Sequence, residues 1–175
     1  MNRSIKILLT GPPGCGKTTA VMAIVKKLNC SNAAGFYTQE IRRDKARRGF
    51  SWIRLDGATG TLAHVDIKGQ FKVGKYGVDV TGFEDAILPV LDIQQSDAKL
   101  FVIDEIGKME CLSDKFTAAV QNLFISDKTV LATVAQKGGS LIKEVKKYPG
   151  VKLFQLKRTE QDKIVTEILE LLSSD

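Results

Sequence analysis

The stretch LLTGPPGCGKTT, residues 8 to 19, decides the fold. It contains the pattern G-x-x-x-x-G-K-[ST] in full, from Gly11 to Thr18. The apolar run within SIKILLT, residues 4 to 10, predicts a buried strand, because it is short and ends at a glycine. Apolar residues then recur at helical spacing, at Val21, Ile24, Val25 and Leu28. A strand, a glycine-rich loop and a helix in this order are the setting in which this pattern binds phosphate.

The loop has the composition of an anion-binding site. Its glycines allow backbone N–H groups to turn inward, and the N-terminus of the following helix adds free donors and a favourable dipole. We expect Lys17 to act catalytically on the β- and γ-phosphates of a nucleotide, and the Thr18 hydroxyl to ligate Mg²⁺. The segment expected to bind the nucleotide comprises Gly11, Pro12, Pro13, Gly14, Cys15, Gly16, Lys17, Thr18 and Thr19.

A second buried strand brings carboxylates to the same edge of the sheet. In LFVIDEIG, residues 100 to 107, four apolar residues precede Asp104 and Glu105. Ligands of open α/β sheets bind at the carboxyl ends of strands. We expect Asp104 to hold Mg²⁺ through water, because Mg²⁺ keeps much of its hydration. Glu105 is expected to activate a water against the γ-phosphorus; the alternative is a solvated strand-end carboxylate.

The rest of the chain alternates strands with helices, which predicts an α/β fold of three layers around a mostly parallel sheet. Further strands are expected at 99–105, 129–134 and 151–156, and helices at 81–91, 113–126 and 160–173. Thr81 and Glu84 form a capping box, Ser113 is an N-cap, and Pro89 predicts a kink or an early stop. Residues 34 to 80, rich in aromatic and β-branched residues, predict antiparallel hairpins inserted into a single domain of residues 1–175.

Composition narrows the class of protein. With 43% hydrophobic and 26% charged residues, and no apolar run near the ~18 residues of a membrane helix, we expect a cytoplasmic monomer with no membrane partner. The three cysteines, Cys15, Cys30 and Cys111, fit neither a disulfide framework nor a zinc site.

The net charge of +6 is local, because the segment from residue 42 to residue 54 contains six basic residues and one acidic residue, Asp44. These are Arg42, Arg43, Lys45, Arg47, Arg48 and Arg54.

Five segments carry a family resemblance: TGPPGCGKTT, GFYTQEIR, RRGFSWIRLDG, VGKYGVDV and DEIGKME. In this order and spacing they closely resemble the THEP-type nucleoside-triphosphatases, also called cancer-related nucleoside-triphosphatases, over nearly the whole chain. The resemblance implies a RecA-like P-loop NTPase core, with a strand between the phosphate-loop strand and the DE strand. It implies slow, Mg²⁺-dependent hydrolysis of ATP, GTP, CTP and UTP.

The resemblance also assigns the second nucleotide-site segment. That segment is Leu100, Phe101, Val102, Ile103, Asp104, Glu105, Ile106 and Gly107, of which we expect the carboxylates to do the chemistry. The chain departs from the family at Glu160-Gln161-Asp162, where relatives often carry NRD, which puts the role of that arginine in doubt although Arg158 is close by. It departs again at AQKGGSLI, residues 135 to 142, which lacks the proline pattern of some relatives.

Four other residues are weaker candidates. Lys75 and Lys108 either face the triphosphate or are surface lysines. Thr133 could orient the attacking water, although a strand residue is the simpler interpretation. His64 reads as a packed or exposed histidine rather than a catalyst.

Two other functions stay open. A small-molecule or nucleotide kinase could use the same loop with the basic segment as a lid, although Glu105 suits water activation, which a kinase must suppress. An RNA-linked nucleotide switch would need stacking aromatics, which Phe50 and Trp52 offer near the arginines. The simpler interpretation of Arg42 to Arg48 is a solvated hairpin tip, so nucleic acid is not the expected partner.

Overall fold

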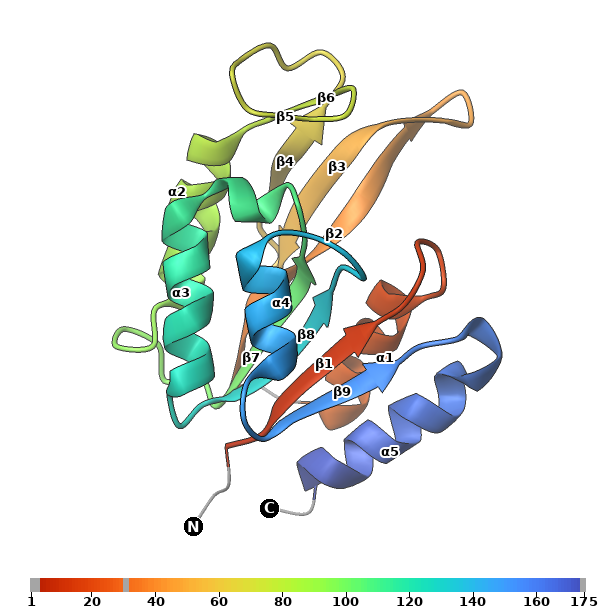
Figure 1. Cartoon of the computed structure of the whole chain (residues 1–175), viewed down its shortest axis with the longest axis vertical. Helices are drawn as coiled ribbons and strands as arrows, with labels where there is room; N and C mark the ends of the chain where they lie inside the picture. The colour runs from red at the N-terminus through yellow and green to blue at the C-terminus, as the bar shows by residue number, and fades with distance from the viewer. Residues whose placement is uncertain (1–3, 30–31, 174–175) are drawn as a thin grey trace.

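The computed structural model describes residues 4–29 and 32–173, so Cys30 lies outside the described residues. Within them, one sheet has the strand order β5-β6-β4-β3-β2-β7-β8-β1-β9 (Figure 1). The strands are β1 (Lys6–Thr10), β2 (Ala33–Arg43), β3 (Ala46–Arg54), β4 (Thr59–His64), β5 (Lys72–Val73), β6 (Tyr76–Val78), β7 (Leu100–Ile106), β8 (Thr129–Val134) and β9 (Val151–Gln155). The helices are α1 (Lys17–Leu28), α2 (Val80–Leu91), α3 (Asp114–Ile125), α4 (Ser140–Lys147) and α5 (Gln161–Ser173), with short 3₁₀ turns η1 (Glu110–Leu112) and η2 (Arg158–Glu160).

The centre of the sheet is parallel. Strand β1 pairs in parallel with β8 on one side and β9 on the other, and β8 pairs with β7. The expected strand between the phosphate-loop strand and the DE strand is therefore β8. Because the carboxyl ends of parallel strands meet at one edge, this order brings the loop after β1, the carboxylates of β7 and the end of β8 together.

The antiparallel hairpins extend the same sheet instead of forming a separate layer. The first four residues of β2 pair in parallel with β7, from Ala33 with Leu100 to Phe36 with Ile103. From Phe36 onward β2 pairs with β3 in antiparallel orientation, and β4, β6 and β5 follow. The β2–β3 hairpin runs out beyond the helices that cover the sheet (Figure 1). The expected insertion is thus confirmed, and it shares β2 with the core.

Helices cover both faces of the sheet, as the α/β pattern predicts. Helices α2, α3 and α4 lie over one face, and α1 and α5 lie side by side over the other (Figure 1). On the first face Phe36 contacts the rings of Phe83 and Phe116 edge-on, with centroids 5.5 and 6.1 Å away. The second face buries Val21 and Ile24 of α1. In the described part of the chain, no helix has the length and apolar character that crossing a membrane requires.

Two local expectations about helix α2 are wrong. Helix α2 is capped by Asp79, whose carboxylate accepts a hydrogen bond from the Gly82 N–H at 2.9 Å. Thr81 therefore lies inside the helix, and Glu84 accepts from Ser113 Oγ at 2.7 Å instead of closing a capping box. The helix also continues past Pro89 to Leu91, so there is no early stop.

The other N-cap expectation is confirmed. Ser113 caps α3, because its hydroxyl accepts from the Phe116 N–H at 2.9 Å. Helix α4 was not expected at all, since its short apolar pattern at Leu141, Ile142 and Val145 follows two glycines and is mixed with lysines.

Candidate functional site

The phosphate loop connects β1 to α1, and within it the Cys15 N–H donates to the Pro12 carbonyl at 3.2 Å. Gly16 has φ of 99°, in the left-handed region that favours glycine. No side chain caps the N-terminus of α1, so its first N–H groups remain available to an anion. Lys17 Nζ donates to the carbonyl oxygens of Gly11 at 3.1 Å and Pro12 at 3.4 Å, so the ammonium lies over the loop. This is the arrangement expected of a triphosphate cradle.

Asp104 lies where four elements meet at the sheet edge. Its Oδ2 accepts from Thr18 Oγ1 at 2.7 Å and from the Thr38 N–H of β2 at 3.4 Å. Its Oδ1 accepts from Thr133 Oγ1 at 2.5 Å, so Thr133 fixes the carboxylate from β8. Burial raises the pKa of Asp104, and the hydrogen bonds from Thr133 and Thr18 oppose that rise. The hydroxyl of Thr18 and the carboxylate of Asp104 are hard oxygen donors in contact, a set that fits Mg²⁺.

Glu105 and Lys17 face one cavity of about 280 Å³. Burial raises the pKa of Glu105, the Lys17 ammonium lowers it, and the charge of Asp104 raises it further. The cavity therefore places a cation for phosphate oxygens and a carboxylate with a raised pKa around the same space. Its lining comprises Gly11, Pro13, Lys17, Glu105, Ala135, Gln136 and Lys137. Sequence reasoning missed the last three, which lie in the loop after β8.

A third carboxyl, Glu110 of η1, also lies at this site. Its side chain is buried and lies against Gly107: a Cβ at Gly107 would be 2.8 Å from Glu110 Oε2 and 3.4 Å from Glu105 Oε1. Burial, followed by the charge of Glu105, raises the pKa of Glu110 to about 8. The segment DEIGKME contains this residue, but a charged residue in a loop carries no signal of burial. Sequence reasoning therefore missed it.

The raised pKa of Glu110 predicts a pH-dependent stability. A carboxyl that holds its proton more tightly when folded stabilises the fold fully below its unfolded pKa, near 4.5, and loses that contribution as the pH rises toward about 8. Within this window its part of the free energy of unfolding should fall by about 1.4 kcal/mol per pH unit. Urea unfolding measured at several pH values between 5 and 8 should therefore show a free energy of unfolding that falls less steeply with pH in Glu110→Gln than in the wild type. Equal slopes in both proteins would contradict the burial of an ionisable Glu110.

Gly107 is predicted to be required for the geometry of the two glutamates. In Gly107→Ala the new Cβ must displace the carboxyl of Glu110, and it crowds that of Glu105. We expect kcat to fall on the order of tenfold or more, since a misplacement near 1 Å costs up to ~10²-fold, while nucleotide affinity stays within about threefold. Steady-state kinetics with a binding titration measure both. Gly69→Ala is the matched control, because a Cβ there meets nothing within 4 Å; equal losses in both variants would contradict the prediction.

The apolar residues of the second predicted segment support the site from the core. Phe101, Val102, Ile103 and Ile106 are fully buried, and Leu100 is nearly so. The two cysteines that the structure describes, Cys15 and Cys111, are free thiols. Burial raises the pKa of Cys111 to about 12.

The weaker candidates fall in different places. Thr133 joins the site through Asp104, whereas Lys75 lies in the β5–β6 turn with its ammonium 5.4 Å from the Tyr76 ring centroid. Lys108 is exposed beside Gly107. His64 ends β4, and its Nδ1 accepts from the Asp66 N–H at 3.2 Å.

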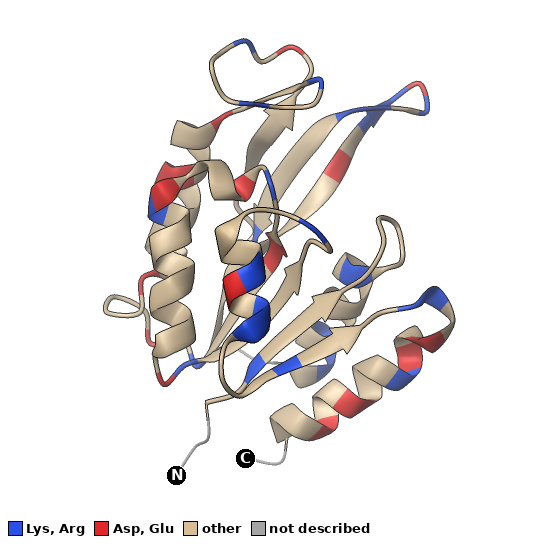
Figure 2. Cartoon of the chain, viewed as in Figure 1, with Lys and Arg blue, Asp and Glu red and all other residues tan. Residues whose placement is uncertain are grey.

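Five of the six basic residues, Arg42, Arg43, Lys45, Arg47 and Arg48, lie at or near the tip of the β2–β3 hairpin, beyond the helix layers (Figure 2). Arg54 lies at the other end of β3 and pairs with Asp56. Glu40 forms ion pairs there with Arg42 at 2.6 Å and Arg47 at 2.8 Å. The guanidinium of Arg47 lies 5.3 Å from the Phe50 ring centroid. These contacts support the interpretation of a solvated hairpin tip, in which part of the positive charge is compensated locally.

At the departure from the family pattern, Gln161 lies against the phosphate loop. A Cβ at Gly16 would be 2.5 Å from Gln161 Oε1. The Gln161 side chain therefore contacts the N-terminus of α1, and Arg158 is exposed in η2.

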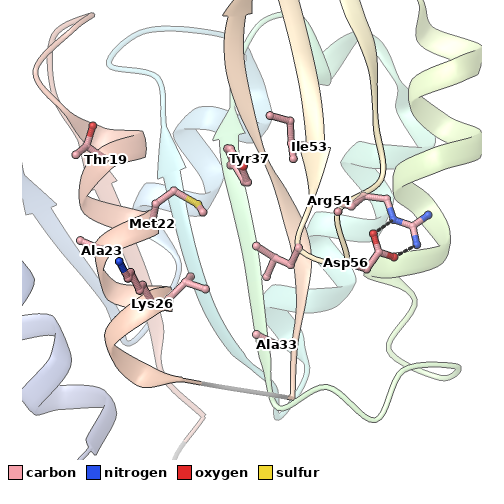
Figure 3. Close-up of a pocket in the computed structure, with 12 residues that line it drawn as sticks. Thr19, Met22, Ala23, Lys26, Ala33, Tyr37, Ile53, Arg54 and Asp56 are labelled. Carbon is pink, nitrogen blue, oxygen red and sulfur yellow. Dashed lines mark hydrogen bonds and ion pairs between the residues drawn. The ribbon is translucent and has the colours of Figure 1, made fainter.

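A second, larger pocket of about 900 Å³ lies between α1 and the strands β2 and β3. Figure 3 shows Thr19, Met22 and Lys26 along α1 on one side, with Tyr37 and Ile53 across from them and Arg54 paired with Asp56 at the rim. Thr19, expected at the nucleotide, lines this pocket. Sequence patterns do not predict this pocket, because it forms only when α1 and the β2–β3 hairpin are placed relative to each other in space.

Comparisons with known proteins agree with this geometry. A family model described as NTPase matches residues 6–169. The nucleoside-triphosphatase THEP1 of Thermotoga petrophila is 41% identical over 96% of this chain and 93% of its own length. The crystal structure of THEP1 from Aquifex aeolicus superposes with a TM-score of 0.89 at 37% identity, covering 97% of this chain and 99% of that one. The solution structure of a human cancer-related nucleoside triphosphatase superposes with a TM-score of 0.82 at 34% identity, covering 98% and 99% of the two chains.

Proposed function

The chain belongs to the NTPase family and is an enzyme that acts on nucleoside triphosphates, and we propose that it hydrolyses them in an Mg²⁺-dependent reaction. The observation that carries this proposal is the shared cavity. The Lys17 ammonium and the Glu105 carboxylate line the same cavity of about 280 Å³. The hydrogen bond between Thr18 and Asp104 lies at the same edge of the sheet.

Each group of the site has a separate task in the reaction. The free N–H groups of the loop and of α1 hold the β- and γ-phosphates, and Lys17 offsets charge on them. Thr18 and Asp104 would hold Mg²⁺, which when bound supplies further neutralisation of phosphate charge. Glu105 accepts a proton as the water oxygen attacks the γ-phosphorus; the bond to the β,γ-bridging oxygen breaks and the diphosphate leaves. A raised pKa suits this base, because general bases work best when their pKa is near the working pH.

Substrate breadth and slow turnover belong to the same proposal. The groups assigned above address phosphates and metal, which ATP, GTP, CTP and UTP share. Among the residues described as lining the cavity, the cations are Lys17 and Lys137 and none is an arginine. An arginine at the transition state contributes on the order of 10³ to 10⁵ in rate in related NTPases, so we propose a slow basal rate.

The test is to measure the release of phosphate from ATP, GTP, CTP and UTP, once with Mg²⁺ and once with EDTA. Each reaction is repeated with added compounds that carry a hydroxyl or a phosphate group able to accept the phosphoryl group. The proposal expects free phosphate from all four within about tenfold of one another, and loss of the signal with EDTA. Transfer of the phosphoryl group to an acceptor in place of water would establish a kinase instead.

A further inference from the structure

Glu110 is a buried carboxyl that the mechanism above does not use. It is 5% exposed, and the backbone N–H groups of Glu110 and Gly107 partly oppose the rise in its pKa that burial causes. Charged side chains are rarely buried without a partner or a task, and these backbone groups leave the task open. The ionisable groups that act on it are Glu105 and Asp104, both acidic, and its neighbour along the chain is the thiol of Cys111. Glu110 forms no ion pair among those that the structure describes in residues 4–29 and 32–173.

The backbone holds Glu110 in a fixed place relative to Glu105. The Cys111 N–H donates to the Gly107 carbonyl at 3.0 Å and the Ser113 N–H to the Glu110 carbonyl at 3.1 Å, which together close η1 against the end of β7. On the other side, the Ala135 N–H donates to the Ile106 carbonyl at 3.2 Å, which ties the end of β7 to the loop after β8. Glu105 is thus held near the end of β7 and Glu110 in η1, and the segment between them is anchored on both sides.

Both carboxyls reach the space beside Gly107, where no side chain separates them. One oxygen of each lies close to the position that a Cβ of Gly107 would occupy, at 2.8 Å for Glu110 Oε2 and 3.4 Å for Glu105 Oε1. Two ionised carboxylates repel each other in a buried site, whereas a protonated carboxyl can donate to an ionised one. Because Glu110 is the more buried and Glu105 faces Lys17, the proton belongs on Glu110.

We propose that Glu110 is a positioning residue, whose buried carboxyl braces the Glu105 side chain beside Gly107 and keeps its carboxylate directed into the phosphate cavity. The inference rests on the proposed role of Glu105 in activating water. Without the brace Glu105 gains rotamers that point away from the γ-phosphorus. The loss then falls on kcat, and nucleotide affinity, which depends on the loop, Lys17, Thr18 and Asp104, stays.

The test is a double-mutant cycle in the full-length protein, read by single-turnover hydrolysis of saturating Mg²⁺-ATP and by a nucleotide titration. Glu110→Leu removes the hydrogen-bond donor, and Glu110→Asp moves the carboxyl back by one methylene. Each should lower the rate constant of hydrolysis by on the order of 10- to 100-fold. The Kd for nucleotide should stay within about threefold of the wild-type value. Glu110→Gln keeps size and donor without charge and should restore the rate to within about threefold. Glu105→Gln/Glu110→Leu should be no slower than Glu105→Gln alone, because Glu110 acts through Glu105.

The outcomes distinguish a failure of the proposed hydrolysis mechanism from a failure of the bracing role of Glu110. A wild-type rate in Glu105→Gln would overturn the proposed mechanism itself. A slow Glu105→Gln with a full rate in Glu110→Asp or Glu110→Leu would overturn the bracing role and leave the mechanism standing. A rate in Glu110→Gln as low as in Glu110→Leu, or additive losses in the double variant, would also overturn it. If Glu110→Leu does not fold, Glu110→Asp against Glu110→Gln decides the question.

Discussion

Replacing Glu105 with glutamine is expected to slow single-turnover ATP hydrolysis by on the order of 10² to 10⁴, the usual contribution of a positioned general base. Glutamine keeps the size of the side chain and can still hydrogen-bond, but it cannot take the proton of the attacking water. Nucleotide should still bind, because Lys17, Thr18 and Asp104 are unchanged. Removing a negative charge from a cavity that receives a triphosphate should hold affinity at or above that of the wild type.

Asp104→Asn is the informative comparison for this variant. Asp104 accepts from Thr18, Thr38 and Thr133, so its replacement weakens the metal side of the site and should raise the Mg²⁺ concentration needed for half-maximal rate. Glu105→Gln should leave that requirement unchanged. A near wild-type rate in Glu105→Gln would assign water activation to another group and contradict the mechanism proposed for this site.

Lys17→Ala is expected to abolish measurable hydrolysis and to weaken triphosphate binding strongly. Lys17 supplies the ammonium that lies over the loop, and charge-assisted hydrogen bonds contribute about 1.5 to 3 kcal/mol each, or roughly ten- to over a hundredfold in affinity. The affinity loss should be larger for ATP than for AMP, which lacks the β- and γ-phosphates. Isothermal titration calorimetry with both nucleotides measures this difference.

Lys27→Ala is the matched control for that variant. Lys27 is an exposed lysine in the last turn of the same helix, so its removal changes the net charge equally without touching the phosphate loop. It should bind and hydrolyse ATP like the wild type. Unchanged ATP affinity and turnover in a folded Lys17→Ala protein would remove the phosphate-loop interpretation altogether.

The parts of the site that local sequence specifies were predictable. The loop from Gly11 to Thr18 needs residues of particular conformational freedom and charge in a fixed order, and the run before Asp104 shows a buried strand ending at a carboxylate. Both signals lie within a few residues, so no knowledge of long-range contacts is needed to find them. The family resemblance implied one strand between the phosphate-loop strand and the DE strand, and the pairing of β8 with β1 and β7 confirms it.

The features that escaped prediction depend on contacts between distant segments. Thr81 and Glu84 have the spacing of a capping box, but Asp79 competes for the same helix start, and Glu84 is drawn to Ser113 and Lys115 of another helix. The burial of Glu110 depends on how η1 folds back onto β7. The 900 Å³ pocket requires α1 and the β2–β3 hairpin to be placed in space first.

The central place of β1 in the sheet has a consequence for how the protein is made. The strand that carries the phosphate loop is synthesised before the other strands that the structure describes, yet both of its neighbours, β8 and β9, come last among them, with Lys6 aligned to Val130 and Val151. During translation β1 therefore stays unpaired for a long time. The β2–β3 hairpin can form early, because its two strands are adjacent in the sequence. The emerging chain should acquire the ability to bind a nucleotide late, after β9 has left the ribosome, so that fragments released before that point carry the phosphate-loop sequence without its activity.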